Sequence, residues 1–476
     1  MKKIKILFFT ILLMIVVVGV SGYFWLQNNP TGQALFHFGG LVVGANDNSV
    51  ILKQALGLSK PKTYLLLFLN NTELRPGGGF IGAYAVVRID KAKPEILKIE
   101  GSEILDKNAT AFLDNPPEPI QRSLAVDNWF FRDSNWSPDF ASSSENVLRA
   151  YAKENGLLSE NIDAVVGFTP TVLEEFLKIV GPITAEGIEF NAQNFTEKLE
   201  YEVEYGYVDR GEEFVERKNL LADVATALIA KGRENILEGL SQYFAVVQRM
   251  ILEKQIVFYS VDSSYQSILK SQNLSGQMTT STGDYLFWVD ANLGSLKTDV
   301  ALTRDLTYKI VSTGTQYLAR ATMYYDHTGD YDWRTTRYLA YSRIFVPLGS
   351  RLISITGSDV EDALGKLPTD EGVENGRQWF GSYIKIIPGK SLAVTFEYLL
   401  PSDIIDFEKS KQYNLFVQKQ IGTNQIGLNL NLNFGRNIRP VEPSTFEMGL
   451  DNNSNNDYNF KTDLVIDRAF VIEFDN

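Results

Sequence analysis

Hydrophobic residues form one long run near the N-terminus and many short runs in the rest of the chain. The long run extends from residue 6 to residue 26 and is interrupted only by Thr10 and Ser21. As a helix rising about 1.5 Å per residue, it would cross the hydrocarbon core of a bilayer, which is about 30 Å thick. Lysines precede the run, and this favours a cytoplasmic N-terminus. The pattern predicts a cytoplasmic stub and transmembrane anchor over residues 1–29, with the rest outside the cytoplasm.

A cleaved signal peptide is the alternative interpretation of this segment, because Gly19, Ser21 and Gly22 are small. The apolar run is, however, longer than the usual core of a signal peptide, and it lacks an Ala-x-Ala cleavage site. We therefore expect an uncleaved, single-pass protein of the cytoplasmic membrane. A juxtamembrane segment over residues 30–60 would follow the anchor.

Two strand-like runs with a polar turn between them lie at residues 63–90. The runs YLLLFL and GAYAVVRI are short and rich in β-branched or aromatic residues, and this favours strands. The turn carries Glu73, Arg75 and three successive glycines after Pro76. Proline followed by glycines marks a sharp bend, so the segment predicts two adjacent strands around a polar turn.

Strand-like and helix-like patterns then alternate up to about residue 290. The apolar strand NIDAVVGF precedes the helix TVLEEFLKIVG, in which Leu173, Phe176, Leu177 and Val180 recur at core spacing. Two more amphipathic helices and the strands IVFYS and YLFWV complete this part. The alternation predicts an α/β domain over residues 61–290, with a mixed or partly parallel sheet and helices on its faces.

From residue 291 onward, strand-like runs are separated by Gly, Asp or Pro turns. Examples are TDVALTRDLTYKIV, YLARATMYYDH, TRYLAYSRIFVPLG and GLNLNLNFG. Apart from part of 359–367, nothing between them has the pattern of a long helix. This spacing predicts an all-β sandwich over residues 291–476.

Composition narrows the functional classes. The formal net charge of −13 argues against a general nucleic-acid binder, which needs clustered Lys and Arg. The chain has no cysteine, which excludes disulfides, Cys-ligated zinc, iron–sulfur clusters and thiol catalysis. The carboxylate-rich stretch YEVEYGYVDRGEEFVER is interpreted as a solvated face.

Four motifs indicate a family. They are NNTELRPGGGFIGAYAVVRID, RDSNWSPDF, IDAVVGFTPTVLEEFLKIVGPI and NLGSLKTD. In these motifs the chain resembles the bacterial family called domain of unknown function 4012, from about residue 60 into the β-rich part. This resemblance implies no biochemical activity, because the family has none assigned.

More distantly, the chain resembles the LytR–CpsA–Psr phosphotransferases, which attach polyprenyl-pyrophosphate-linked glycopolymers to peptidoglycan. The glycine turn, the pair Arg132-Asp133, the strand–helix unit at 162–181 and Arg217 match parts of that family's pattern. Where the family has Ser-Asp after the glycine, this chain has Phe-Ile-Gly at 80–82. An acid that would help to hold magnesium is therefore missing.

Transfer of a pyrophosphate-linked sugar needs cations around the phosphates, a carboxylate-held Mg²⁺ and a base for the incoming hydroxyl. Guanidinium groups donate paired hydrogen bonds to phosphate, and successive backbone N–H groups can cradle an anion. The resemblance therefore implies Arg75, Arg132, Arg217, Gly77, Gly78 and Gly79 for substrate binding, Asp133 and Asp139 for catalysis, and Glu73 and Asp133 for Mg²⁺.

The same residues also have a structural interpretation, in which the glycines form a tight connection with positive φ and the Arg-Asp pair ties down a loop. Two functions follow. The first is a membrane-anchored envelope protein that binds or transfers a lipid-linked pyrophosphate glycopolymer precursor for peptidoglycan. The second is a non-catalytic surface scaffold or adhesin whose β-sandwich meets a partner protein or glycan. Convergence of Arg75, Arg132 and Arg217 on one cleft would favour the first.

Overall fold

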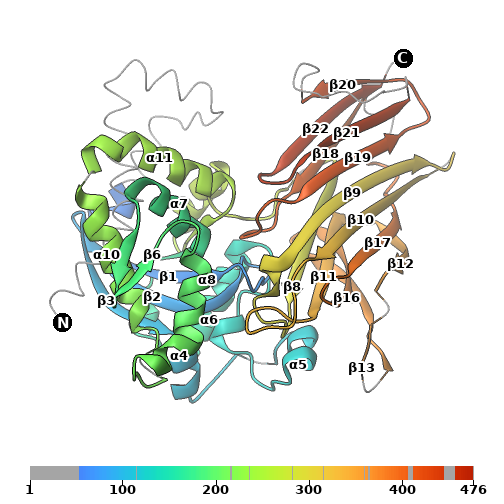
Figure 1. The fold of residues 1–476 in the computed structure, drawn as a ribbon. Coiled ribbons are helices and arrows are strands. Elements are labelled where there is room, and N and C mark those ends of the chain that lie inside the picture. The colour runs from blue at the N-terminus through green and yellow to red at the C-terminus, as the bar shows by residue number, and fades with distance from the viewer. Residues whose placement is uncertain are drawn as a thin grey trace.

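The computed structural model describes residues 53–474, except 114, 215–216, 235, 281, 315, 359, 363–364, 406–410 and 444–455. The anchor predicted over residues 1–29 lies outside the described residues. Within the described part, no helix is both long and apolar enough to cross a membrane. The mixed α/β character predicted from the sequence is confirmed, and an α/β half and a β-rich half lie side by side (Figure 1).

A five-stranded sheet forms the centre of the α/β half, in the order β3-β2-β1-β4-β7. β1 is antiparallel to β2 and parallel to β4, so the sheet is mixed as predicted. The strand pair expected at residues 63–90 is found as β1 and β2. The strands are β1 (Lys62–Asn70), β2 (Phe80–Asp90), β3 (Lys93–Gly101), β4 (Ala164–Phe168) and β7 (Ile256–Ser260).

Helices cover both faces of this sheet. Tyr64 and Leu66 of β1 pack in one core with α7, α10 and α11, whereas Leu65 and Leu67 pack in the other core with α6. Successive side chains of a strand point to opposite faces, so the continuous apolar run of β1 serves both cores. The helices of this half are α4 (Ser102–Asn108), α5 (Glu118–Leu124), α6 (Phe140–Lys153), α7 (Pro170–Val180), α8 (Phe195–Tyr201), α9 (Tyr207–Asp209), α10 (Asn219–Glu234), α11 (Ile236–Leu252) and α12 (Ser263–Ser271).

Short elements connect these helices and strands. α8 continues directly into the π-helix η4, which continues into α9. The sequence pattern predicted neither the π-helix nor the small hairpin before α8. The short elements are η2 (Phe131–Asp133), η3 (Ser159–Asn161), η4 (Glu202–Gly206), η5 (Thr298–Ala301), β5 (Ile183–Ala185) and β6 (Ile188–Phe190).

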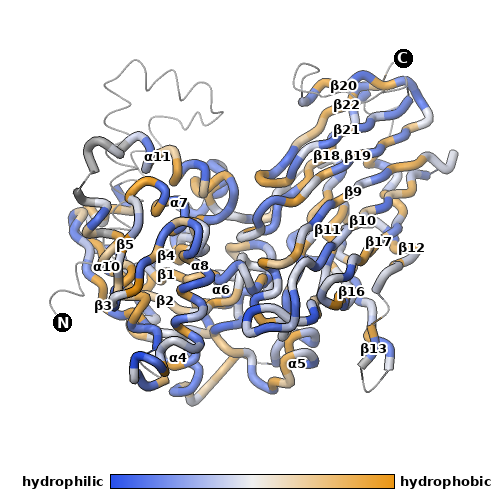
Figure 2. The backbone as a smooth tube through the Cα atoms, in the orientation of Figure 1, coloured by the Kyte–Doolittle hydropathy of each residue, from blue (hydrophilic) through white to orange (hydrophobic). Residues whose placement is uncertain are grey.

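Two large sheets in the β-rich half share one hydrophobic core. Leu286 and Trp288 enter it from the seven-stranded sheet, and Leu306 and Tyr308 enter it from the six-stranded sheet. Hydrophobic and hydrophilic stretches alternate along the long strands, as expected where one face is buried (Figure 2). The six-stranded sheet contains β9 (Leu302–Ser312), β10 (Tyr317–His327), β12 (Arg351–Thr356), β17 (Ser391–Leu399), β19 (Gly427–Asn433) and β21 (Asp457–Asp463).

The seven-stranded sheet includes β8, whose sequence YLFWV was assigned to the end of the α/β domain. β8 pairs with β11 and, in parallel, with β18. The other face of this sheet packs on the α/β half, where Trp136 stacks on Tyr341 with ring centroids 6.1 Å apart. Its strands are β8 (Asp284–Asn292), β11 (Tyr338–Pro347), β15 (Thr369–Glu374), β16 (Arg377–Ile386), β18 (Gln412–Gln418), β20 (Ile438–Glu442) and β22 (Arg468–Phe474), and β13 (Glu361–Asp362) and β14 (Gly365–Lys366) form a separate pair.

Candidate functional site

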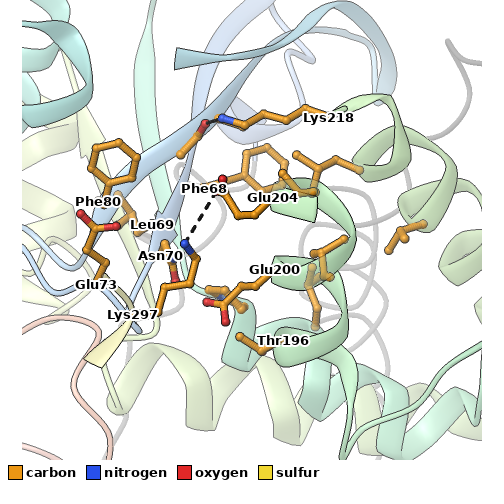
Figure 3. A pocket seen from close by; sticks show the side chains of 18 of the residues that line it. Phe68, Leu69, Asn70, Glu73, Phe80, Thr196, Glu200, Glu204, Lys218 and Lys297 are labelled. Carbon is orange, nitrogen blue, oxygen red and sulfur yellow. Dashed lines mark hydrogen bonds and ion pairs between the residues drawn. The ribbon is translucent and has the colours of Figure 1, made fainter. Parts of the chain in front are cut away.

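A cavity of about 460 Å³ lies between the central sheet and the helices α7, α8 and α10. A cavity of this size suits a small-molecule ligand. In Figure 3, Phe68, Leu69 and Asn70 at the end of β1 lie beside it, opposite α8. Its walls are mostly apolar, because they are the core-facing sides of these elements. The apolar wall residues are Phe68, Leu69, Ala83, Phe168, Pro170, Leu173, Phe195, Leu199, Val203, Leu221, Val224, Ala225 and Leu228.

Charged side chains line the part of the cavity that opens to solvent, which we term the mouth. Two of its lining residues are themselves open to solvent, since Phe214 is 54% exposed and the Glu204 side chain is 39% exposed. The charges come from the β1–β2 turn, from α4, η2, α8 and η4, from the segment before α10 and from the β-rich half. Figure 3 shows Glu73, Glu200, Glu204, Lys218 and Lys297 among them. The charged lining residues are Glu73, Glu103, Arg132, Glu200, Glu204, Arg217, Lys218 and Lys297.

Arg217 is the most extensively paired cation of the mouth. Its Nη2 lies 3.1 Å from Oε1 of Glu103, its Nη1 donates to Oε2 of Glu204 at 2.9 Å, and its guanidinium lies over the Phe214 ring at 4.2 Å. Its Nε is buried and has no hydrogen-bond partner among the described residues. Lys218 also pairs with Glu103. Burial lowers the pKa of Lys218, although the Glu103 carboxylate acts in the opposite direction.

Both halves of the molecule contribute to the mouth. Glu200 on α8 accepts a hydrogen bond from Nε of Arg334 in the β-rich half at 2.8 Å, and the backbone N–H of Lys297 donates to the Arg334 carbonyl at 2.9 Å. The Lys297 ammonium lies 3.7 Å from Glu204. Burial raises the pKa of Glu200 above its usual value, and Arg334 opposes this shift. The β-rich half therefore completes the mouth by adding Lys297 to charges that come from the α/β half.

The turn between β1 and β2 lies at the interface of the two halves and is not an exposed loop. The backbone N–H of Leu74 donates to Oδ2 of Asp299 at 3.0 Å, and the Leu74 carbonyl accepts from the N–H of Asn292 at 2.9 Å. The Arg75 carbonyl accepts from Nε2 of Gln420 at 3.2 Å. The turn thus fastens the α/β half to the β-rich half.

Arg75, predicted to bind substrate, is only 2% exposed and does not line the cavity. Its Nε donates to Oδ1 of Asp133 at 3.0 Å, and its Nη2 donates to Oε1 of Glu73 at 3.2 Å. Its Nη1 donates to the Asn292 carbonyl. A buried guanidinium needs such partners, because an unpaired charge in the interior is costly. Arg75 therefore holds Glu73, Asp133 and the Asn292 backbone together and does not itself line the mouth.

Arg132 does line the mouth, and it pairs with two buried acids, Asp106 and Asp133. Its Nη1 lies 3.3 Å from Oδ2 of Asp106, and its Nε lies 3.6 Å from Oδ2 of Asp133. Burial raises the pKa of Asp106 to about 6, and burial followed by the Asp106 charge raises the pKa of Glu154 to about 9. Glu154 also accepts from the N–H of Phe131 at 2.8 Å. Both carboxyls therefore bind a proton more strongly than they would in water, and Glu154 does so more strongly than Asp106.

The three glycines have a packing role in this fold. The N–H of Gly77 donates to the Asn135 carbonyl at 3.0 Å, and the N–H of Gly78 donates to the Arg75 carbonyl at 2.9 Å, so neither is free to cradle an anion. Gly79 has a φ of +147°, and a Cβ there would lie 2.5 Å from the Asn70 carbonyl oxygen. Glycine is required because the turn passes close to neighbouring backbone.

Asp139, predicted to be catalytic, caps α6. Its Oδ1 accepts from the N–H of Ser142 at 2.9 Å, and its Oδ2 accepts from the N–H of Met278 at 2.8 Å. It is buried and is not among the residues that line the cavity. Asp is a preferred residue at a helix N-terminus because its side chain accepts from the free backbone N–H groups there, and this accounts for Asp139 structurally.

Of the arginines expected to converge, Arg132 and Arg217 share the cavity and Arg75 supports it. Lys297 and Glu204 were not named as candidates from the sequence. Lys297 belongs to NLGSLKTD, a motif that carried the family resemblance without a role for its lysine. Glu204 belongs to the carboxylate-rich stretch interpreted as a solvated face, and its side chain is indeed partly exposed, but it also contacts two cations of the mouth.

The predicted magnesium ligands Glu73 and Asp133 both pair with Arg75, and magnesium binding stays a prediction. Among the described residues, no group of three or more His, Asp or Glu side chains is placed to hold a metal. Burial raises the pKa of Glu73, and Arg75 acts in the opposite direction.

These features define a two-part protein in which an α/β half holds an apolar cavity and a β-rich half completes its charged mouth. Residues 59–204 match the family described as protein of unknown function (DUF4012). The predicted resemblance is confirmed for this stretch, which is similar to that family, whereas the motif NLGSLKTD and the β-rich half lie beyond the match. The match includes Glu200 and Glu204, whereas Arg217, Lys218 and Lys297 lie beyond it.

Comparison with curated proteins gave no match. Among solved structures, the chain is similar to the Lin1025 protein from Listeria innocua at 12% identity and a TM-score of 0.23, covering 45% of this chain and 78% of that one. It is similar to the transcriptional regulator yvhJ from Bacillus subtilis at 16% identity and a TM-score of 0.22, covering 49% and 85%. It is also similar to an M1 zinc metallopeptidase from Deinococcus radiodurans at 9% identity and a TM-score of 0.20, covering 36% and 42%. These likenesses carry no functional argument, and the resemblance to LytR–CpsA–Psr phosphotransferases stays a prediction.

Proposed function

We propose that the cavity binds a lipid-linked, anionic glycopolymer precursor of the cell envelope, with its hydrocarbon chain inside and its phosphates at the mouth. The observation that carries this proposal is an apolar cavity whose mouth holds a buried Arg217 Nε without a hydrogen-bond partner among the described residues. A buried polar group left unpaired costs about 1–3 kcal/mol. An anionic head group would supply the missing acceptor.

The walls favour a hydrocarbon chain over a polar ligand. Leu173, Phe195, Val224 and Leu228 line the interior and offer no polar side-chain atom. Burial of each CH₂ group contributes about 0.8 kcal/mol, so an isoprenoid chain would gain affinity with every unit it places inside. The hydroxyls of a sugar would lose hydrogen bonds to water there.

The mouth favours an anionic head group. Arg132, Arg217, Lys218 and Lys297 all line it. Their charges act at short range in a partly water-excluded site, where electrostatic interactions are stronger than in bulk water. Each cation already has a carboxylate partner, so the head group must compete with these carboxylates, and Glu204 is the most exposed of those contacting Arg217 and Lys218.

The arrangement supports binding better than transfer. Asp133 and Asp139, the predicted catalytic acids, are occupied by Arg75 and by backbone N–H groups. Of the acids predicted from the sequence, Glu73 lines the mouth. Glu73 also accepts from Arg75, at 3.2 Å, but unlike Asp133 it lines the cavity, so it is the candidate base for an acceptor hydroxyl in a transfer reaction. The binding function does not depend on magnesium.

In this proposal, residues 1–29 anchor the chain in the cytoplasmic membrane and the rest lies outside the cytoplasm. The support is the lysine-flanked apolar run and the absence of cysteine. The two facing sheets act as a β-sandwich module that presents Lys297 to the mouth. Lipid-linked envelope precursors reside in the same membrane, so the anchor would keep the cavity near its ligand.

The test is direct binding of three probes to the full-length chain in detergent, measured by calorimetry. Farnesyl pyrophosphate should bind, farnesol should bind at least tenfold more weakly, and inorganic pyrophosphate should not bind measurably. Leu173→Trp should block the apolar probes by filling the cavity, and Ala225→Leu serves if the larger side chain disturbs folding. Arg217→Gln should weaken only farnesyl pyrophosphate.

The matched control is Arg320→Gln, because the Arg320 side chain is 44% exposed on β10, where it pairs with Glu397 across the strands. It should bind all probes as the unaltered chain does. The proposal fails if farnesyl pyrophosphate does not bind, or if it binds equally to Leu173→Trp, Ala225→Leu and Arg217→Gln. That result would favour the non-catalytic scaffold.

A further inference from the structure

Exposed hydrophobic side chains gather beside the mouth, on both halves of the molecule. Single exposed hydrophobic residues are normal on a protein surface, but a contiguous group of them marks an interaction site. These residues are termed the rim patch. The rim patch comprises Tyr201, Tyr205, Val208, Phe214, Leu296 and Val300.

Ring contacts join the two tyrosines of the rim patch to the β-rich half. The rings of Tyr201 and Tyr205 lie 5.8 Å apart, and both meet Trp333 of the β-rich half edge-on, at 5.4 and 5.8 Å. Lys297, which follows Leu296, donates its backbone N–H to Arg334, the neighbour of Trp333. Figure 1 shows α8 on the side of the α/β half that faces the β-rich half.

The rim patch also adjoins the cavity. Phe214 belongs to both, since it is exposed and lines the mouth. Glu204, which lines the mouth, lies between Tyr201 and Tyr205 in the sequence of the helix. An apolar chain entering the cavity across Phe214 would stay in contact with hydrophobic atoms throughout.

We infer that the rim patch docks on the surface of a lipid bilayer and sets the mouth of the cavity against it. Tyr and Trp prefer the bilayer interface, where the ring is buried and its polar group meets water. Val208, Leu296 and Val300 add aliphatic groups that would enter the acyl boundary. This inference goes beyond the proposed function, because it concerns the surface and not the ligand of the cavity.

The length of the chain permits this docking. The apolar run that ends at residue 26 predicts an anchor in a bilayer, and the described residues begin at Lys53. An extended segment of residues 30–52 reaches about 75 Å at about 3.3 Å per residue. A domain held on such a tether meets the bilayer repeatedly, so a moderate apolar patch suffices to orient it.

Charge determines which bilayer surface fits. Glu202, Glu204, Asp209, Glu212 and Glu213 lie within the same stretch as the rim patch, and the whole chain carries a net charge of −13. Anionic lipids attract basic segments, not acidic ones. Docking should therefore rest on apolar burial and should proceed on neutral phosphatidylcholine.

The absence of cysteine permits a clean experiment with the full-length chain in phosphatidylcholine vesicles. Two variants, Val208→Cys and Val300→Cys, each place a single cysteine in the rim patch. The cysteine is labelled with nitrobenzoxadiazole, whose fluorescence depends on its environment. The control is Val373→Cys on β15, because Val373 is 60% exposed, close to the 63% of Val208. Both rim labels should shift their emission to the blue and be quenched by spin-labelled lipid at least threefold more than the control.

Three results would overturn the inference. The first is that the rim labels and the Val373→Cys label show the same blue shift and quenching. The second is that neither rim label shows them, and the third is that they appear only when the vesicles contain phosphatidylglycerol. A Tyr201→Ser/Tyr205→Ser double variant should reduce quenching of the Val300→Cys label at least threefold, and unchanged quenching also counts against the inference. No probe for the cavity is present, so this test can fail while farnesyl pyrophosphate still binds, and the reverse also holds.

Discussion

The Nζ atom of Lys297, from the β-rich half, lies 3.7 Å from Oε1 of Glu204 in the π-helix of the α/β half. The other oxygen of Glu204 accepts from Nη1 of Arg217 at 2.9 Å. One carboxylate thus joins two cations from different halves, in the place where the proposed phosphate would lie. π-helical turns are frequent at functional sites, and the partial exposure of Glu204 leaves it room to turn toward solvent.

Replacement of Glu204 by glutamine is expected to strengthen binding of farnesyl pyrophosphate about threefold to tenfold. The reason is that the neutral amide would no longer compete as an anion for Arg217 and Lys297, and partly exposed ion pairs are worth about 0–1 kcal/mol each. Farnesol binding should not change. Calorimetric titration of both ligands measures the difference.

The control for this change is Glu197→Gln, on the preceding helix α8. Glu197 is more exposed and lies 3.6 Å from Arg334, away from Arg217 and Lys297. The Glu197→Gln variant should bind farnesyl pyrophosphate with the same affinity as the unaltered chain. Weaker binding by Glu204→Gln would show that the carboxylate helps to hold the ligand and does not compete with it.

Arg75→Ala is expected to lower the free energy of unfolding, because Arg75 is buried and does not line the cavity. It would leave Asp133 buried without its closest cation, and removal of one partner from a buried ion pair costs about 3–5 kcal/mol. The midpoint of urea denaturation should fall strongly. Arg132→Gln, in contrast, removes a partly exposed side chain and should lower affinity for farnesyl pyrophosphate with a smaller loss of stability. An Arg75→Ala protein of normal stability that binds no ligand would assign Arg75 to the head group directly.

Local patterns were sufficient to predict the elements on which the site is built. The runs around residues 63–90 became β1 and β2, and the spacing of Leu173, Phe176 and Val180 became α7. These predictions succeed because side-chain periodicity directly reflects which face of an element is buried. The family match over residues 59–204 rests on the same stretch.

Partners distant in the sequence could not be predicted. The pattern of YLFWV predicts a strand, but it does not indicate which sheet the strand joins. In the structure β8 pairs with β11 and β18, outside the α/β sheet. Arg75 was taken for a phosphate ligand because its partner Asp133 lies 58 positions away. Lys297 entered the mouth through the packing of two halves. Charge pairing depends on this tertiary arrangement, and residue type alone does not specify it.

Gly79→Ala is expected to destabilise the protein by about 1–3 kcal/mol, through backbone strain at a positive φ and a close approach to Asn70. Gly82→Ala is the matched control, because a Cβ at Gly82 meets nothing within 4 Å and its φ is ordinary. The free energy of unfolding of Gly82→Ala should differ from that of the unaltered chain by no more than about 0.5 kcal/mol, as expected for a neutral site. Equal effects of the two substitutions would contradict the packing role of the turn.

The acids Asp106 and Glu154 are expected to make stability fall as pH rises. The folded-state pKa of Glu154 is raised from 4.5 to about 9 and that of Asp106 from 3.8 to about 6. Between these limits the folded chain binds more protons than the unfolded chain, so the free energy of unfolding decreases with pH. The contribution is fully present below about pH 4 and is lost as pH passes through 9, with a slope of at most about 1.4 kcal/mol per pH unit for each group.

Glu154→Gln should remove most of this dependence while keeping the fold, and urea denaturation between pH 5 and about 9.5 measures it. The amide oxygen of glutamine can accept from the N–H of Phe131, as Glu154 does at 2.8 Å. Glu154→Ala should instead destabilise the protein at every pH, by about 1–3 kcal/mol, because the Phe131 N–H is left buried and unpaired. If Glu154→Gln kept the pH slope of the unaltered chain, the slope would have to come from another group, since glutamine has no proton to lose in this range.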